Sequence, residues 1–206
     1  MAEPIDYFLT VISPWVYLGH RPLMQIARRH GVPIRFRPVA LGAVWQHSGS
    51  VPLAQRSPAR QRYRFVELQR YAELRGVALN CKPAFFPADA SRADLAIAAI
   101  VAAGGDPAEF ALRCGEAVWS LNRNIADEAV VAELLAATGH DAPTIIEAAK
   151  QPVAAAAIAA NNAAANAADA IGVPTYVYRG ENFWGQDRLD LLDRMIASGR
   201  PAYLPL

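Results

Sequence analysis

The amino-acid sequence predicts an α/β protein in which a small sheet is interrupted by a long helical block. Three observations lead to this class. A strand–helix–strand pattern covers Ile5–Val39, helical patterns follow one another over residues 57–168, and the end of the chain returns to short strands and one helix. The 206 residues are 53% hydrophobic and 19% charged, which suits a globular chain with a core of its own.

The amino-terminal unit begins with a short apolar strand at Ile5–Val11, and a helix follows it at once. Ser13 fits the N-cap of this helix, and Pro14 fits its first turn, where the missing N–H of proline costs no hydrogen bond. The helix is expected to end near His30. The next stretch, Ile34–Val39, alternates apolar and basic residues, which is typical of a half-solvated strand near a sheet edge.

The middle of the chain has a different pattern. Residues 40–56 hold glycine, serine and proline without a clear period, which favours a loop. Helical patterns then follow, with prolines near their starts and glycines near their ends, over residues 58–75, 92–103, 107–120, 127–138 and 143–170. We therefore expect a helical insertion domain at residues 57–168, between two pieces of a first domain at residues 1–56 and 169–206.

The last part of the chain returns to β-structure. A strand is predicted at Thr175–Tyr178, a turn around residues 179–181, and a second strand at Asn182–Trp184. A closing helix over Asp187–Ser198 carries its apolar residues on one face. The order β-α-β, helices, β-β-α is that of a thioredoxin-like core with an all-helical insertion.

Composition and motif content exclude several function classes. A net charge of +1 gives no electrostatic reason to expect nucleic acid or an anionic membrane as a partner. No apolar run approaches the roughly 20 residues that cross a bilayer, and the start, MAEPIDYFLT, lacks the basic segment of a signal peptide. Cys81 and Cys114 form no C-x-x-C pair and the four histidines are scattered, so we expect no metal site and a cytoplasmic protein with reduced thiols.

Ser13 lies where the first strand meets the first helix, and two roles fit it. As an N-cap it stabilises the helix by about 1 kcal/mol and needs no other purpose. The same helix start, with unpaired N–H groups and positive potential, also favours an anion. In a thioredoxin order this junction holds a thiolate, but no cysteine occupies it here. The thiolate would then belong to a thiol cofactor, for which glutathione is the natural candidate.

The free energies allow this second role. Lowering the pKa of a free thiol from about 8.5 to about 6.5 takes roughly 2.7 kcal/mol. A helix start supplies about 0.3–1 kcal/mol, rising to about 2 when partly buried, and a hydroxyl hydrogen bond to a charged acceptor adds about 1.5–3 kcal/mol. The two together suffice, with Ser13 as a hydrogen-bond donor to the thiolate and not as a nucleophile.

Three motifs in order, SPWVYLG near the start, GVPTYV before the last strand pair and FWGQDRLDLL at the closing helix, give the chain a resemblance to a known family. It resembles the 2-hydroxychromene-2-carboxylate isomerases, relatives of the kappa-class glutathione transferases within the DsbA-like branch of the thioredoxin fold. The resemblance implies a glutathione-dependent isomerase of aromatic hydrocarbon catabolism. It would interconvert 2-hydroxychromene-2-carboxylate, or a related aromatic catabolite, and trans-o-hydroxybenzylidenepyruvate by reversible thiolate addition. Relatives are often dimers, so a homodimer stays open.

Two other functions stay open beside the isomerase. A kappa-like glutathione S-transferase or peroxidase would consume glutathione. A non-catalytic thioredoxin-fold module would bind peptide through the loop at Pro174. A disulfide oxidoreductase is disfavoured, because the segment Ser13-Pro14-Trp15-Val16 at the helix start holds no cysteine.

The resemblance also implies roles for individual residues. Ser13 would hold the glutathione sulfur, and Val173-Pro174 would form the cis-proline loop whose backbone pairs with the tripeptide. The other cofactor-binding residues would lie at the γ-glutamyl end and in a closing loop: Trp184, Gly185, Gln186, Asp187, Trp45 and Gln55. Plainer roles are also open: Pro174 as a strand starter, Asp187 as the cap of the last helix, and Trp184 as a core aromatic.

Six arginines lie in the segment that runs from residue 56 to residue 75. The simpler interpretation is a solvated helix face, with Tyr63, Val66 and Leu74 packed inward. A narrower hypothesis is that Arg56 and Arg64 face the pocket and hold a substrate carboxylate, since the planar guanidinium matches a carboxylate.

The loop Asn80–Asp89 is rich in proline and phenylalanine. It would either plug the helical block or, as in the resembled family, face the second substrate. In the second case Lys82 would meet a substrate carboxylate and Phe85 or Phe86 would flank an aromatic ring.

Overall fold

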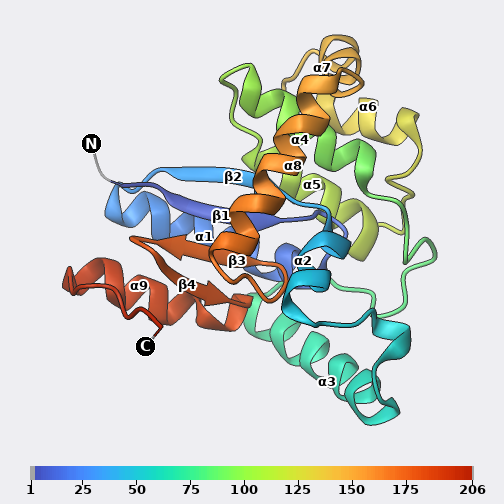
Figure 1. The fold of residues 1–206 in the computed structure, drawn as a ribbon. Coiled ribbons are helices and arrows are strands. Elements are labelled where there is room, and N and C mark those ends of the chain that lie inside the picture. Colours follow the sequence, from blue (N-terminus) through green and yellow to red (C-terminus); the bar gives the residue numbers. More distant parts are fainter. Residues whose placement is uncertain (1–2, 206) are drawn as a thin grey trace.

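The computed structural model describes residues 3–205, and these residues form a single four-stranded sheet at the centre of the molecule (Figure 1). The strands are β1 (Ile5–Leu9), β2 (Ile34–Pro38), β3 (Thr175–Tyr178) and β4 (Glu181–Trp184), in the order β2-β1-β3-β4. β2 runs parallel to β1 at one edge, while the β1–β3 and β3–β4 pairs are antiparallel. The predicted α/β class, with β-α-β and β-β-α halves, is confirmed.

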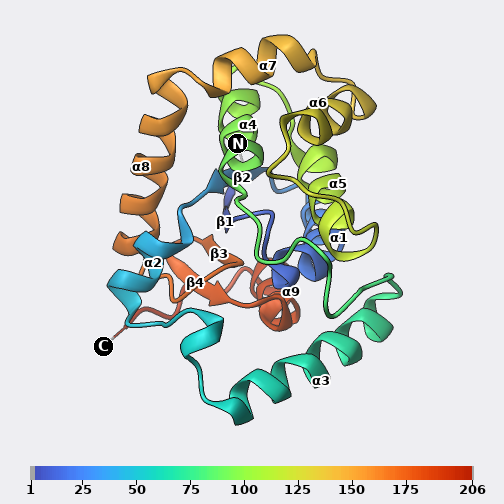
Figure 2. The same ribbon diagram turned by 90° about the vertical axis from the view of Figure 1, so that its right-hand side faces the viewer.

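Helices make up most of the remaining chain. They are α1 (Pro14–His30), α2 (Leu41–Ser48), α3 (Pro58–Arg75), α4 (Ser91–Ala102), α5 (Ala108–Trp119), α6 (Glu128–Ala137), α7 (Ala142–Ala149), α8 (Pro152–Ala167) and α9 (Leu189–Ser198), with short 3-10 turns η1 (Leu53–Gln55) and η2 (Gln186–Arg188). The sheet lies between α8 on one side and α1 and α9 on the other (Figures 1 and 2). α4 to α7 gather at one end, and α3 runs past the opposite end.

Two predicted elements were wrong. Residues 40–56 are not a loop, because α2 and η1 lie there; the buried Val44 helps to seat α2, which packs along α8, and Gly49 ends it in a left-handed conformation. The predicted helix over residues 143–170 is two helices. Pro152 stands in the first turn of α8 and cannot donate a hydrogen bond back into α7, so the chain turns between them.

The prediction that Tyr63, Val66 and Leu74 pack inward was also wrong. Their exposed fractions are 58%, 41% and 69%, and Leu68 is the fully buried side chain of α3. The reason is that α3 lies on the outside of the molecule, where it contacts α1 with one side only (Figure 2).

One hydrophobic core runs through the sheet and the helical block. Tyr7 and Tyr176 of the sheet belong to the same buried cluster as Ile97, Ile100 and Trp119 of α4 and α5. The domain boundaries at residues 57 and 169 stay a prediction, and the core continues across them. The helical block therefore helps to position the loops at the ends of the strands.

Candidate functional site

The junction between β1 and α1 is built around the hydroxyl of Ser13. Ser13 is the N-cap of α1, and its Oγ accepts a hydrogen bond from the Val16 N–H at 3.4 Å. The same hydroxyl donates to the carbonyl oxygen of Val173, also at 3.4 Å. The side chain that caps the helix therefore also faces the loop before β3, which comes from the other end of the sequence.

That loop contains a cis peptide bond between Val173 and Pro174, as the resemblance implied. The Pro174 carbonyl accepts a hydrogen bond from the Gly185 N–H at 2.9 Å, and Thr175 Oγ1 donates to the Gly172 carbonyl at 2.7 Å. These bonds join the cis-proline loop to the segment that precedes α9. Pro174 is thus more than a plain strand starter, since its carbonyl links two parts of the site.

The buried carboxyl group of Asp94 anchors the loop between β1 and α1 by hydrogen bonds. Asp94 of α4 accepts hydrogen bonds from Thr10 Oγ1 and, at 3.0 Å, from the Val11 N–H. Burial raises the pKa of Asp94 to about 7, and the two hydrogen bonds offset only part of that rise. The indole N–H of Trp119 donates to the Ile12 carbonyl at 3.2 Å. The helical block therefore fixes the loop that carries Ser13, and sequence reasoning did not single out Asp94.

The segment Trp184–Asp187, which precedes α9, forms one wall of the cavity described in the next paragraph. Gly185 has φ 97°, and a Cβ there would lie 2.4 Å from Asp187 Oδ1, so this position requires glycine. Gln186 is buried, and its Oε1 accepts a hydrogen bond from Arg75 Nη2 at 3.1 Å. Asp187 pairs with Arg188 and lies in η2, so it does not cap α9, whose N-cap is Arg188.

A cavity of about 530 Å³ lies beside these elements, a volume typical of small-molecule sites. It brings together seven of the predicted site residues: Arg56, Arg64, Val173, Trp184, Gly185, Gln186 and Asp187. Ser13 does not line it; this residue is 7% exposed and adjoins the cavity through its hydrogen-bond partner Val173. Trp184 is 45% exposed, so the core role considered for it was wrong.

Five further predicted residues do not line this cavity: Pro174, Trp45, Gln55, Lys82 and Phe85. The ring centroid of Trp45 lies 6.0 Å from the guanidinium of Arg56, which does line it. Gln55 and Lys82 are exposed, and Phe85 is 44% exposed. With Ser13 and with Phe86, the alternative to Phe85, these are the predicted site residues outside the lining.

The cavity also has aromatic walls that sequence reasoning did not assign to it. They are Trp15, from the first turn of α1, and Tyr63 and Tyr71 of α3. Trp15 and Tyr71 meet edge to face, with ring centroids 6.4 Å apart. The spacing of Arg60, Tyr63, Arg64, Glu67 and Tyr71 along one helix face was the available signal. The simpler interpretation of this segment was instead a solvated helix face with Tyr63 packed into the core.

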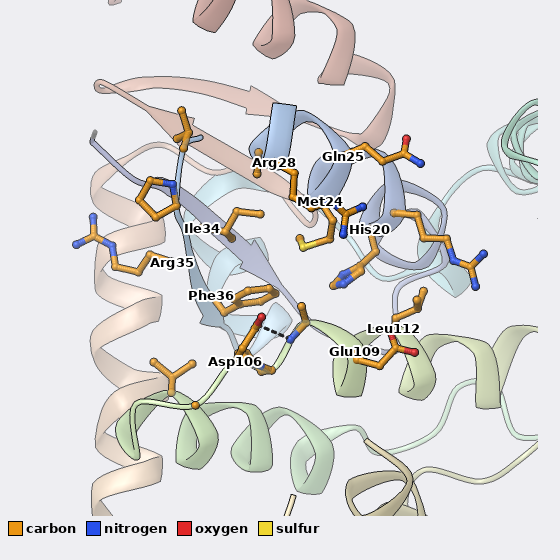
Figure 3. A pocket seen from close by; sticks show the side chains of 18 of the residues that line it. His20, Met24, Gln25, Arg28, Ile34, Arg35, Phe36, Asp106, Glu109 and Leu112 are labelled. Atoms are coloured by element: carbon orange, nitrogen blue, oxygen red, sulfur yellow. Dashed lines mark hydrogen bonds between the residues drawn. The ribbon is translucent and has the colours of Figure 1, made fainter. Parts of the chain in front are cut away.

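A larger cavity of about 1020 Å³ lies along later turns of α1, beside β2 and the α4–α5 connection (Figure 3). His20, Met24 and Arg28 of α1 and Asp106 of that connection line it. None of the residues predicted for the site does so. The larger cavity is therefore separate from the residues predicted for the site.

The described residues also bear on metal binding and on membrane insertion. Within residues 3–205, no group of three or more histidine, cysteine, aspartate or glutamate side chains is placed to hold a metal ion. No helix in the same range has both the length and the hydropathy of a bilayer-crossing segment. Cys81 and Cys114 are free thiols, and burial raises the pKa of Cys114 well above its usual value.

The fold and the site define a class of protein, and sequence comparison agrees. The sequence profile of the DSBA-like thioredoxin domain matches residues 4–197. The chain belongs to that family.

More particularly, the chain is similar to the 2-hydroxychromene-2-carboxylate isomerase of Sphingobium xenophagum, with 27% identity over 94% of this chain and 97% of the relative. It is also 27% identical to glutathione S-transferase kappa 1 of Caenorhabditis elegans, over 96% and 92% of the two chains. A solved 2-hydroxychromene-2-carboxylate isomerase superposes with a TM-score of 0.79 at 24% identity, over 94% of both chains. The resemblance predicted from the three motifs is confirmed.

Proposed function

We propose that the protein is a glutathione-dependent isomerase that interconverts 2-hydroxychromene-2-carboxylate, or a related aromatic catabolite, and trans-o-hydroxybenzylidenepyruvate. The observation that carries the proposal is the position of Ser13. Its hydroxyl stands at the start of α1, 3.4 Å from the carbonyl of the cis-proline loop and next to the cavity. No cysteine is present at this junction, so the reactive sulfur comes from a bound thiol.

Three parts of this site would bind glutathione: the start of α1, the Val173-Pro174 loop and Asp187. Its sulfur would lie at the start of α1, where the Ser13 hydroxyl turns from the Val173 carbonyl to donate to the thiolate. Its peptide backbone would pair with the backbone of Val173, and its γ-glutamyl ammonium would meet the carboxylate of Asp187. A solved structural neighbour with 22% identity and a TM-score of 0.67 is the cytosolic disulfide reductase DsbM from Pseudomonas aeruginosa with GSH. Reduced glutathione also suits the cytoplasm expected from the free thiols.

The reaction requires a thiolate that adds and then leaves. When the hemiketal ring opens, the substrate exposes a double bond conjugated to a carbonyl group. The thiolate adds to the β-carbon and the electrons move to the carbonyl oxygen as an enolate. The former double bond is now single and rotates. The enolate then expels the thiolate, which restores the double bond in the trans geometry and leaves glutathione unchanged.

Ser13 would act on the sulfur at both ends of this sequence. A hydrogen bond to the thiolate keeps the sulfur ionised before addition and stabilises it again as it leaves. Because the hydroxyl donates and does not attack, no base has to remove its proton. The start of α1 would contribute in the same direction through the positive end of the helix dipole.

A kappa-like glutathione transferase is the second candidate, and the relative from C. elegans favours it. The two reactions differ in their stoichiometry, because a transferase consumes one thiol for each turnover while the isomerase recovers it. A non-catalytic module would bind peptide at the Val173-Pro174 loop and would show neither behaviour.

The decisive experiment is an ultraviolet assay of 2-hydroxychromene-2-carboxylate with catalytic and with stoichiometric glutathione. The isomerase converts many equivalents of substrate for each glutathione, and free thiol measured at the end equals the amount added. Thiol loss in step with turnover supports the transferase. No turnover, together with no glutathione binding by calorimetry at millimolar concentration, supports the binding module.

A further inference from the structure

Arg64 of α3 occupies an unusual position for a charged side chain. Its guanidinium carbon lies 5.5 Å from the ring centroid of Phe86, 5.7 Å from that of Trp119 and 6.0 Å from that of Phe65. The residue also lines the 530 Å³ cavity. Three aromatic rings outside the cavity lining therefore lie near the cation, while the Arg64 side chain also borders the cavity.

This cation has no anionic partner in the described part of the chain. No carboxylate lies within 4.0 Å of its guanidinium, and no hydrogen-bond acceptor is assigned to it in that range. Glu67, one turn further along α3, pairs instead with Arg70 at 2.7 Å. Burial lowers the pKa of Arg64 to about 10, and the neighbouring Arg56 contributes to the shift. A guanidinium removed from water without a carboxylate is unfavourable, and a bound anion would offset this cost.

The other cations near the cavity are less available. Arg56 donates through Nε to the Val51 carbonyl at 3.1 Å and lies over the ring of Trp45. Lys82 is exposed, does not line the cavity, and has its Nζ 5.8 Å from the Phe65 ring. Two further arginines line the cavity: Arg188 pairs with Asp187, and Arg60 is exposed to solvent. Among the arginines of the lining, Arg64 is thus the half-buried one whose guanidinium has no carboxylate or other hydrogen-bond acceptor among residues 3–205.

We propose that Arg64 binds the carboxylate of an aromatic acid, whose ring lies against the aromatic walls of the cavity formed by Trp15, Tyr63 and Tyr71. The guanidinium offers two parallel N–H donors, which match the two oxygens of a carboxylate. The flat aromatic body of the ligand finds rings to pack against. The assignment rests on the proposed function for the identity of the natural substrate, but the binding chemistry follows from the cavity itself.

The probe is trans-2-hydroxycinnamate, an aromatic acid that resembles the product, with its neutral methyl ester as the matched compound. Binding is measured by tryptophan fluorescence and by calorimetry without glutathione. In the wild-type protein the acid is expected to bind roughly 10- to 100-fold more tightly than the ester. Arg64→Met should lose this preference, Arg64→Lys should keep part of it, and Arg62→Met should leave it within about twofold. Arg62 is a suitable control because it is exposed on the same helix and does not line the cavity.

Equal affinity for acid and ester in the wild-type protein would overturn the proposal, and so would equal behaviour of the Arg64 and Arg62 variants. Circular dichroism and thermal unfolding show whether Arg64→Met is folded. If it is not, the test uses Arg64→Lys, whose preference for the acid over the ester should be smaller than that of the wild-type protein. The assay involves no turnover, so the two proposals fail separately. An inactive protein that binds the acid through Arg64 removes the isomerase alone. An active protein whose KM is unchanged by Arg64→Met removes the subsite alone.

Discussion

The two cavities that border α1 differ in more than size. The larger one lies along later turns of the helix. On its walls Arg35 pairs with Asp6 and Glu109 with Arg113, while Arg21 and Arg28 are exposed to solvent. The smaller one adjoins the first turn and contains Arg64, which is half-buried and has no carboxylate partner among residues 3–205. The comparison teaches that the two cavities differ in the burial of their unpaired cations, and the proposed carboxylate subsite rests on that difference.

A buried ionisable group lies near each cavity, and the two groups respond to pH in opposite ways. Asp94 supports the loop next to the smaller cavity, and burial raises its pKa to about 7. His20 lines the larger one, and burial lowers its pKa to about 4, although the Ala108 backbone and Asp106 act in the other direction. His20 Nε2 has no hydrogen-bond partner among residues 3–205, whereas both carboxylate oxygens of Asp94 have one.

The largest expected effect concerns Asp94. Between about pH 4 and pH 7 the unfolded chain releases a proton that the folded protein keeps, so the free energy of unfolding should fall as pH rises. Over the full window the fall is at most roughly 4 kcal/mol, from about three pKa units. In Asp94→Asn this slope should be absent. Urea unfolding of both proteins at pH 4, 5.5 and 7 measures it, and parallel profiles would show that Asp94 does not titrate in this way.

His20 should give a somewhat smaller slope of the opposite sign. Between about pH 6.5 and pH 4 the unfolded chain takes up a proton that the folded protein refuses, so stability should fall as pH falls, by roughly 3 kcal/mol at most. His20→Asn keeps an acceptor for the Tyr7 hydroxyl, which lies 3.5 Å from Nδ1, and should remove this slope. The same urea series applies. If the free energy of unfolding falls as steeply with falling pH in the variant as in the wild-type protein, His20 is not a buried, neutral histidine.

Ser13→Ala should separate activity from stability. Loss of the hydroxyl donor should lower kcat/KM roughly 10- to 150-fold and raise the pKa of bound glutathione by about one to two units, since a hydrogen bond to a charged acceptor contributes about 1.5–3 kcal/mol. The lost cap should cost only about 1 kcal/mol of stability. Thiolate absorbance, titrated with pH, measures the pKa of bound glutathione in the wild-type protein and in the variant. The same thiol pKa in both proteins would remove Ser13 from the mechanism.

The smallest effect is expected in the larger cavity. Arg28→Ala changes an exposed side chain in its lining, so stability should stay within about 0.5 kcal/mol and kcat/KM within about twofold. The measurements are the urea series and the isomerase assay described above. A loss of activity similar to that of Ser13→Ala would mean that the larger cavity takes part in the reaction, and the contrast between the two cavities would be lost.

The sequence predicted the strands and the junction at Ser13 because the signals there are local. A β-branched run, a capping serine with a following proline, and a glycine at a helix end act over a few residues. The cis bond at Val173 and the role of Gly185 came from the resemblance. The hydrogen bonds that join them to the rest of the site, from Ser13 to the Val173 carbonyl and from Gly185 to the Pro174 carbonyl, connect distant parts of the chain, and no local pattern shows such contacts.

The side of α3 that faces the cavity was not predicted for the same reason. The positions of Tyr63 and Arg64 fit an ordinary amphipathic helix, and only the tertiary arrangement turns them toward a cavity. Asp94 was not recognised because a single acidic residue near a helix start usually faces water. Its burial follows from the packing of α4 against the end of β1, over a distance that periodicity does not describe.

The central strand pair has a consequence for synthesis. β1 pairs with β3, although the whole helical block is synthesised between the two strands. Until β3 has been made, one edge of β1 stays open, and the Ser13 hydroxyl lacks the Val173 carbonyl that it faces in the folded protein. A chain interrupted within the helical block therefore lacks both the partner strand of β1 and the second half of the Ser13 junction.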